Sequence, residues 1–419
     1  MTRNKFFLIS SSVAVSLALL FNSSGEASGP AIKLPPAKCQ KDFNSFEAWR
    51  EDFRVEAMRS GVSTVTWNAA LPSLVVDTEV LSRDNSQGAF YTSFLKFSIP
   101  RAHPRIPRAR NLLKSHGALF KKVEATYGIP GEILLSLWGL ETDFAVSTIP
   151  GATQFPILSS MTTLAYDCRR PEIFRDNLKS ALKLIENKTV DIENMTGQWA
   201  GEMSGLQLTP SNYLNFGVDF DKDGRIDIVN SVPDLMASAA SMLKSYGWVA
   251  KQPYIIEVKV PEKMDWQYAD LTLEKMHPLA NWTKQGVTLA DGSALPAGLP
   301  NASLMLPMGH LGPAFLAFPN FKTLLQWNAS LNNALTASYL AYRTANVNAP
   351  PMSSGNGTPE ILTAAMLKNL QTLLAKRGYN MGKIDGFLGT ATRAATKDMQ
   401  MKLGLPADGY PTTELLNKL

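Results

Sequence analysis

The hydrophobic pattern of this chain is mainly helical. Apolar residues recur at three- and four-residue spacing, which marks one face of an α-helix. Five segments of the first 345 residues show this spacing: 112–127, 132–144, 171–186, 232–246 and 321–343. Residues 254–260 alternate between apolar and polar positions, which predicts a strand. The sequence therefore indicates a mainly α fold with a small β-containing part.

A second, smaller unit follows at the C-terminal end. Residues 346–358 are rich in Pro, Ser and Gly, a composition typical of a flexible linker. Helical patterns then cover 361–377 and 391–403, with a turn-rich loop at 382–389 between them. We therefore divide the chain into a large domain at 28–345, a linker at 346–358 and a compact helical domain at 359–419.

The first residues have the composition of an export signal. Arg3 and Lys5 precede an apolar stretch, and the small residues Gly25 and Ala27 fit a signal-peptidase site. The alternative is a membrane anchor, but a spanning helix needs ~20 apolar residues and this stretch is short and rich in serine. We expect residues 1–27 to be a cleaved signal peptide and the mature chain to be exported.

Two cysteines and a weak net charge restrict the chemistry. In an exported chain Cys39 and Cys168 can form one disulfide, and the alternative is two buried thiols. No Cys-x-x-Cys motif indicates redox catalysis, and the four histidines form no zinc motif. The net charge of +5 suits an anionic polymer or simply solubility, and no basic run with interleaved aromatic residues indicates nucleic-acid binding.

One carboxylate continues an apolar helical face. Leu134, Leu137 and Glu141 follow one another at steps of three and four residues. Burial against Leu137 and Trp138 would raise the pKa of the Glu141 carboxyl, as a general acid requires. The alternative is a solvated glutamate at a helix end, and periodicity alone does not exclude it.

Several motifs surround Glu141 along the chain. In order they are Trp138-Gly-Leu-Glu-Thr142, Phe155-Pro-Ile-Leu-Ser-Ser-Met-Thr-Thr-Leu-Ala-Tyr-Asp-Cys168, Trp199-Ala-Gly-Glu-Met-Ser-Gly-Leu-Gln207, Pro210-Ser-Asn-Tyr213, Asp219-Phe-Asp-Lys-Asp-Gly-Arg-Ile-Asp227, Ser245-Tyr-Gly-Trp248, Gly312-Pro-Ala-Phe-Leu316 and Trp327-Asn-Ala-Ser330. In this order and spacing, over roughly residues 40–345, the chain resembles the B family of lytic murein transglycosylases.

The resemblance implies a lysozyme-like helical domain that cleaves the glycan strands of peptidoglycan. Such enzymes cut the β-1,4 bond between N-acetylmuramic acid and N-acetylglucosamine and leave a 1,6-anhydro end. One glutamate serves as acid and then as base, and it maps onto Glu141. Ordinary glycosidases use two carboxylates. Asp143 is the nearest second one, but it faces another side of the helix, so we interpret it as structural.

The resemblance also implies substrate-binding residues. Gln207 matches a glutamine near the scissile sugars and Asn328 an asparagine in the cleft; Trp199 and Tyr213 are candidate sugar-facing rings, with core aromatic residues as the alternative. The chain departs from the family pattern at Ala145, Gln198, Glu202-Met203-Ser204, Leu208-Thr209-Pro210 and Ser241-Met242. These departures put the activity level and the substrate range in question.

An acidic loop resembles a calcium-binding loop. Asp219, Asp221, Asp223 and Asp227 occupy positions one, three, five and nine, and a glycine stands at position six, as a seven-coordinate cation requires. The twelfth position is Asn230, which is not a bidentate glutamate. The alternative is an acidic turn held by its own hydrogen bonds. We expect no required cofactor and a structural Ca²⁺ as a candidate.

The C-terminal unit has its own set of motifs, which consists mainly of glycine-containing turns and of polar residues on the predicted helices. The motif residues are Leu370-Gln371, Gly378-Tyr379, Gly382, Ile384-Asp-Gly386, Gly389, Thr392, Gln400, Gly404-Leu405 and Asp408-Gly409. The unit resembles the small three-helix peptidoglycan-binding domain of many wall hydrolases. The resemblance implies a periplasmic protein whose partners are peptidoglycan glycan strands. Other wall enzymes are candidate partners, and we expect a monomer.

Three hypotheses follow. The first is a periplasmic lytic transglycosylase with a C-terminal wall anchor, in which tethering raises the effective concentration of substrate. The second is a non-catalytic or weakly active wall-binding protein on the same fold. The third is a muramidase that uses water, for which Asp143 or Glu202 would have to supply a second carboxylate in the cleft.

Overall fold

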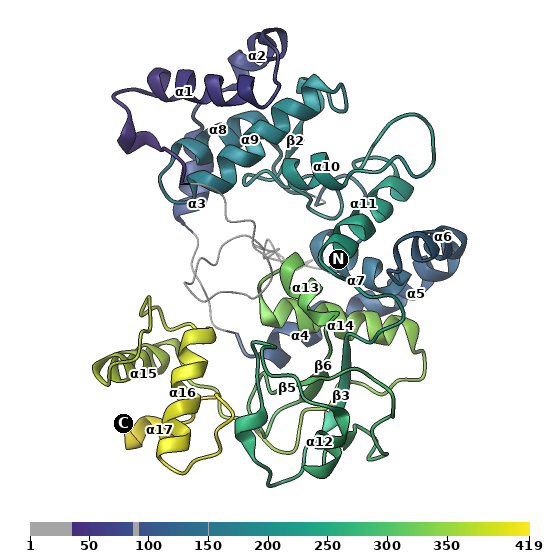
Figure 1. Ribbon diagram of the computed structural model, residues 1–419, viewed down its shortest axis with the longest axis vertical. Helices are drawn as coiled ribbons and strands as arrows, with labels where there is room; N and C mark the ends of the chain where they lie inside the picture. The colour runs from purple at the N-terminus through teal and green to yellow at the C-terminus, as the bar shows by residue number, and fades with distance from the viewer. Residues whose placement is uncertain (1–35, 87–91, 150) are drawn as a thin grey trace, which may run out of the picture.

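A computed structural model describes residues 36–86, 92–149 and 151–419. The predicted signal peptide at 1–27 lies outside the described residues. The described part is mainly helical, as predicted, with a small sheet region and a separate group of C-terminal helices (Figure 1). No described helix has both the length and the apolar character needed to cross a membrane.

One group of helices packs around the α8–α9 pair. It consists of α1 (Phe46–Arg59), α2 (Thr64–Ala70), α3 (Thr78–Asn85), α8 (Ile157–Tyr166), α9 (Pro171–Glu186) and α10 (Pro210–Phe216). The amphipathic pattern of 171–186 gives α9 the predicted bounds, and its apolar face contacts α1, α2, α8 and α10. The short strands β1 (Phe155–Pro156) and β2 (Thr196–Gly197) pair antiparallel beside this group.

A second group surrounds α7 (Gly131–Thr142). It consists of α4 (Phe94–Ala102), α5 (Ile106–Ser115), α6 (Gly117–Tyr127), α11 (Val232–Ser245), α13 (Phe321–Trp327) and α14 (Leu331–Ala345). Helix α7 contacts α5, α6, α11 and α14, and every residue from Ile133 to Thr142 is buried. This explains why the sequence of α7 is apolar on nearly all sides.

Two predicted helices are each divided into two. The segment 112–127 is interrupted between α5 and α6, where His116 leaves helical geometry (φ −104°, ψ 23°) before Gly117, a poor helix former. The segment 321–343 is interrupted at Asn328, whose backbone is extended. Asn328 Oδ1 accepts the N–H of Ser330, and Ser330 caps α14, so local side-chain hydrogen bonds replace helical ones there.

The predicted strand lies in a four-stranded antiparallel sheet of order β4-β3-β6-β5. The strands are β3 (Ile255–Lys259), β4 (Thr288–Leu289), β5 (Ser303–Met305) and β6 (Ala314–Ala317). The sheet and the short helix α12 (Leu279–Lys284) share a separate hydrophobic core, which includes Phe318 and Trp282 of α12. The 3-10 turns of the described chain are Gln40–Asp42, Leu71–Ser73, His103–Arg105, Ile192–Asn194 and Trp266–Tyr268.

The C-terminal helices are α15 (Ala364–Lys376), α16 (Thr390–Lys402) and α17 (Thr413–Lys418). The segment expected to be a flexible linker is held against the large domain. The N–H of Ser353 donates to Glu257 Oε1 at 2.7 Å, and Asn356 Nδ2 donates to the carbonyl of Val260 at 2.7 Å. Composition predicted a flexible linker, and it did not indicate the side-chain and backbone oxygens of the large domain to which this segment is bonded.

Candidate active site

Glu141 lies in the last turn of α7 with only 7% of its surface exposed. The helix ends directly after it, because Asp143 and Phe144 take left-handed backbone conformations (φ 55° and 63°). A carboxylate at this point is held by a rigid helix and surrounded by apolar side chains. This is the buried position that the apolar stripe predicts.

The two oxygens of Glu141 have different surroundings. Oε1 accepts a hydrogen bond from the indole Nε1 of Trp327 at 3.2 Å. Oε2 is buried and has no hydrogen-bond partner among the described residues. One oxygen is therefore fixed by a hydrogen bond, while the other keeps its acceptor positions unused by the described residues.

Burial raises the pKa of Glu141 to about 7. The hydrogen bond from Trp327 opposes this shift because it stabilises the charged form, and the negative charge of Glu202 adds to it. A carboxyl group that titrates near neutral pH can donate a proton and later accept one. The site therefore has the electrostatics of a general acid and base.

A tight loop at residues 197–208 brings Glu202 to the end of α7. Within the loop, the carbonyl of Glu202 accepts the N–H of Gln198 at 2.8 Å. Gly205 fastens the loop to the helix end: its carbonyl accepts the Thr142 hydroxyl at 2.6 Å and its N–H donates to the carbonyl of Val146. A Cβ at Gly205 would meet the Ala145 carbonyl oxygen at 2.0 Å, so only glycine permits this approach.

Glu202 is the second carboxylate of the site. It is half-buried, and burial raises its pKa to about 7, while the positive charge of Arg170 lowers it. Asp143 instead points to the surface, with ion pairs to Arg105 at 3.2 Å and Arg108 at 3.6 Å. The sequence-based interpretation of Asp143 as a structural residue agrees with these contacts.

The predicted polar substrate-binding residues lie on the two segments that flank Glu141. Gln207 closes the 197–208 loop in a left-handed conformation (φ 54°), and its Nε2 donates to the carbonyl of Ser204 at 2.8 Å. Asn328 is buried and directly follows Trp327, the hydrogen-bond partner of Glu141. Asn328 is therefore the sequence neighbour of the hydrogen-bond partner of Glu141, and Gln207 lies in the loop that Gly205 fastens to the end of α7.

The two predicted sugar-facing rings are core residues in this structure. Tyr213 is 2% exposed, and its hydroxyl donates to the carbonyl of Ile226. The covered ring and the bonded hydroxyl of Tyr213 favour the alternative interpretation, a core aromatic residue. Trp199 is 4% exposed and belongs to the main hydrophobic core, as the alternative interpretation holds.

Sequence reasoning did not single out Trp327 as the partner of Glu141. The resemblance at Trp327-Asn-Ala-Ser330 implies a role for Asn328 only. The sequence feature that could have indicated this role is the indole N–H donor of Trp327, directly before the interruption of the predicted helix at Asn328. The pairing itself joins residues 186 positions apart, which no local pattern encodes.

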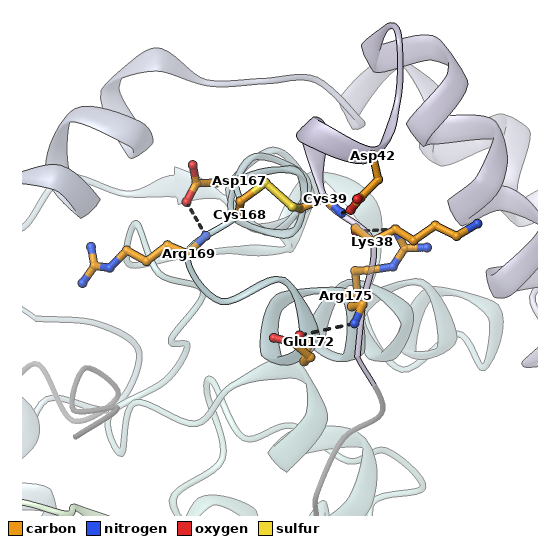
Figure 2. The surroundings of a disulfide bond; sticks show 9 residues. Lys38, Cys39, Asp42, Asp167, Cys168, Arg169, Glu172 and Arg175 are labelled. Atoms are coloured by element: carbon orange, nitrogen blue, oxygen red, sulfur yellow. Dashed lines mark hydrogen bonds between the residues drawn. A yellow bond between two sulfur atoms is a disulfide. The ribbon is translucent and has the colours of Figure 1, made fainter. Parts of the chain in front are cut away.

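Cys39 and Cys168 form a disulfide (Figure 2), with an S–S distance of 2.07 Å. It joins the first described residues to the loop between α8 and α9. Around it, Arg175 donates to the carbonyl of Lys38 and pairs with Asp52 at 3.0 Å. The N-terminal segment is thus fixed to the helical domain by a covalent bond and by a buried guanidinium.

The acidic loop brings three of its four predicted ligands together. Carboxylate oxygens of Asp219, Asp221 and Asp223 lie within 4.8 Å of one another, and Asp219 Oδ1 is buried without a hydrogen-bond partner among the described residues. Asp227 is not in this cluster, since its Oδ1 accepts the N–H groups of Val229 and Asn230. The prediction of Asp227 as a direct ligand is therefore not supported, while the other three fit a hard cation.

Comparison with known proteins places the chain in a family. Residues 45–342 match the family described as a transglycosylase SLT domain, and residues 363–419 match a putative peptidoglycan binding domain. Because the first match covers most of the chain, the protein belongs to the transglycosylase SLT domain family. The helical fold with its small sheet and C-terminal helical domain agrees with this assignment.

Individual relatives share this architecture. The chain is 27% identical over 230 residues to membrane-bound lytic murein transglycosylase B of Escherichia coli K12, an alignment that covers 52% of this chain and 58% of that protein. It matches the crystal structure of SltB3 from Pseudomonas aeruginosa in complex with NAG-anhNAM-pentapeptide at 35% identity and a TM-score of 0.80, over 90% of this chain and 99% of that one. Escherichia coli Slt35 in complex with calcium shares the fold, with a TM-score of 0.58 at 23% identity over 70% of this chain and 92% of that one.

Proposed function

We propose that this protein is a lytic murein transglycosylase. It would cleave the β-1,4 bond between N-acetylmuramic acid and N-acetylglucosamine of peptidoglycan and leave 1,6-anhydromuramic ends. The observation that carries the proposal is the buried Glu141 carboxyl, with one oxygen bonded to Trp327 and the other unpartnered. The related SltB3 has been crystallised with NAG-anhNAM-pentapeptide, which contains such an anhydro end.

The reaction takes place in two steps at one carboxyl group. Protonated Glu141 donates its proton to the glycosidic oxygen as the bond from that oxygen to the muramic C1 breaks. The muramic C6 hydroxyl then attacks C1, and its proton returns to the Glu141 carboxylate. The carboxyl group ends as it began, and no water is consumed. A pKa of about 7 suits both steps because neither protonation state is strongly disfavoured at neutral pH.

The helical domain and the C-terminal domain have separate roles in this proposal. The site on α7 performs the cleavage, and the C-terminal domain keeps the enzyme on the insoluble polymer, which raises its effective concentration there. The disulfide between Cys39 and Cys168 is consistent with an exported, oxidising compartment such as the periplasm. Asp219, Asp221 and Asp223 would hold a structural Ca²⁺.

Glu202 supports a second candidate function. A second carboxylate close enough to raise the pKa of Glu141 could activate a water, as in a muramidase. Mass spectrometry of digested sacculi separates the candidates. A lytic transglycosylase releases anhydro-muropeptides, a muramidase releases reducing ends, and a non-catalytic wall-binding protein releases nothing.

A further inference from the structure

Residues 346–357 join α14 to the C-terminal helices and are bonded to the large domain; we call this segment the strap. At its start, the guanidinium of Arg110 donates to two of its carbonyls, at 3.2 and 3.3 Å. At its end, the N–H of Gly357 donates to the carbonyl of Leu311 at 3.0 Å. Between these points, two neighbouring backbone N–H groups of the strap are bonded to buried side chains.

The first of these side chains is Tyr339 on α14, which is buried. Its hydroxyl oxygen accepts the N–H of Met352 at 3.1 Å and a guanidinium N–H of Arg343 at 2.8 Å. A tyrosine hydroxyl also has one proton to donate, and His103 Nε2 lies 3.1 Å away as the remaining partner. Two accepted bonds and one donated bond use every hydrogen-bonding position of this hydroxyl.

These three bonds determine the protonation state of His103. Because Tyr339 donates to Nε2, that nitrogen carries no proton and the imidazole is neutral. An imidazolium would present an additional N–H to an oxygen whose acceptor positions are filled. Burial and the positive charge of Arg343 lower the pKa of His103. The closed arrangement therefore requires neutral His103, and acid opposes it.

The charged groups around His103 do not favour an imidazolium either. Its turn contacts α4 and α5, and its Nε2 reaches Tyr339 on α14. The charged residues of these three helices are all cations, namely Lys96, Arg101, Arg108, Arg110, Lys114 and Arg343. Arg105, in the same turn, is a cation that pairs with Asp143. No described carboxylate forms an ion pair with His103, so a positive charge on its ring would not be compensated.

Glu257, on β3, holds the next N–H of the strap. Its Oε1 accepts the N–H of Ser353 at 2.7 Å. Burial raises the pKa of Glu257, although the N–H of Ser353 and the charge of Arg343 oppose this shift. Because these causes act in opposite directions, Glu257 does not give the strap a single direction of response to acid. His103 does, since each influence on it favours the neutral ring.

We propose that His103 and Tyr339 form a pH-sensitive latch, which holds the strap at neutral pH and releases it in acid. When His103 takes up a proton, one bond to the Tyr339 hydroxyl must break. The bond to Met352 is the one that breaks, because Met352 lies in a segment without regular secondary structure, whereas Arg343 is fixed on α14. Release lengthens the free connection between the large domain and the C-terminal domain. The latch concerns this connection alone and goes beyond the proposed reaction.

The test is hydrogen–deuterium exchange of the full chain at about pH 7.5 and about pH 5, the range in which histidine changes charge. The amide of Met352 is followed as a protection factor, which corrects for the intrinsic pH dependence of exchange. His103→Gln keeps an acceptor for the Tyr339 hydroxyl but cannot take up the proton. Tyr339→Phe removes the acceptor of the strap N–H. The matched control is His116→Gln, at a half-buried histidine between α5 and α6.

In the wild type and in His116→Gln, protection at Met352 should fall by about fivefold in acid, as the loss of one hydrogen bond predicts. His103→Gln should abolish this fall, and Tyr339→Phe should show low protection at both pH values. If Tyr339→Phe fails to fold, His103→Gln and the wild type decide the question. The latch is overturned if wild-type protection does not change or if His103→Gln shows the same fall. A parallel fall at Gly357, whose acceptor is a carbonyl, also overturns it, because the whole strap or fold would then be loosening.

Discussion

The indole N–H of Trp327 donates to Oε1 of Glu141 at 3.2 Å and thereby joins the end of α13 to the end of α7. This bond fixes the carboxyl group and leaves Oε2 unpartnered among the described side chains. It also opposes the effect of burial on the pKa of Glu141. Burial has the largest effect on the pKa of the proposed acid, and Trp327, from a distant part of the sequence, fixes its position and opposes that shift.

Replacement of Trp327 by phenylalanine tests this dependence. Trp327→Phe keeps an aromatic ring but removes the donor that stabilises the carboxylate, so the pKa of Glu141 should rise from about 7. The alkaline limb of the pH–rate profile, where the acid loses its proton, should move to higher pH by about one unit. Trp248→Phe is the control, because its Nε1 is buried without a described partner. An unmoved or lowered alkaline limb would contradict the role of Trp327.

Glu202→Gln should shift the same limb in the opposite direction. Loss of the negative charge removes a contribution that raises the pKa of Glu141, so the acid should deprotonate at lower pH. The pH–rate profile of muropeptide release measures this, with Glu193→Gln, an exposed glutamate, as the matched control. If the variant instead lost activity at every pH and the wild type gave reducing ends, Glu202 would be the base of a muramidase.

The disulfide should contribute strongly to stability. Cys39 and Cys168 are 129 residues apart, so their bond restricts a long loop in the unfolded chain. Replacement of both by serine should lower the free energy of unfolding by about 2–5 kcal/mol. Thermal unfolding followed by circular dichroism measures the change, and reductant should lower the melting temperature of the wild type but not of the variant. Equal melting temperatures for the two proteins would show that the bond does not stabilise the fold.

Calcium should stabilise the protein through the acidic loop. Ca²⁺ that binds the folded chain at Asp219, Asp221 and Asp223 raises the melting temperature in a saturable way, and a chelator reverses the rise. Asp219→Asn should abolish the response, whereas Asp191→Asn, at an exposed aspartate elsewhere, should retain it. A Ca²⁺ response that persists in Asp219→Asn would place the ion elsewhere.

The sequence predicted those features that depend on local pattern. The helix at 171–186 has the observed bounds, and the helix around Glu141 and the strand at 254–260 lie within two residues of theirs. The break at Asn328 was missed, because the apolar spacing continues through it and only the side-chain bond to Ser330 reveals the interruption. Apolar periodicity indicates which face of a helix is buried. It does not indicate where a side chain forms hydrogen bonds with the backbone in place of helical ones.

Contacts between distant segments could not be predicted in this way. Tyr213 was expected to face a sugar, but tertiary packing covers its ring and the carbonyl of Ile226 takes its hydroxyl. Asp227 has the spacing of a cation ligand, yet it caps its own turn. In each case the residue type was compatible with both roles, and the choice depended on neighbours that only the folded chain supplies.

The most direct test of the central claim is mass spectrometry of sacculi digested by the wild type and by Glu141→Gln. The glutamine keeps the size of the side chain but can neither donate nor accept the required proton. The wild type should release anhydro-muropeptides, and the variant should release at least about a thousandfold less while it still co-sediments with sacculi. Full release of anhydro products by Glu141→Gln would contradict the assignment of Glu141 as the acid and base.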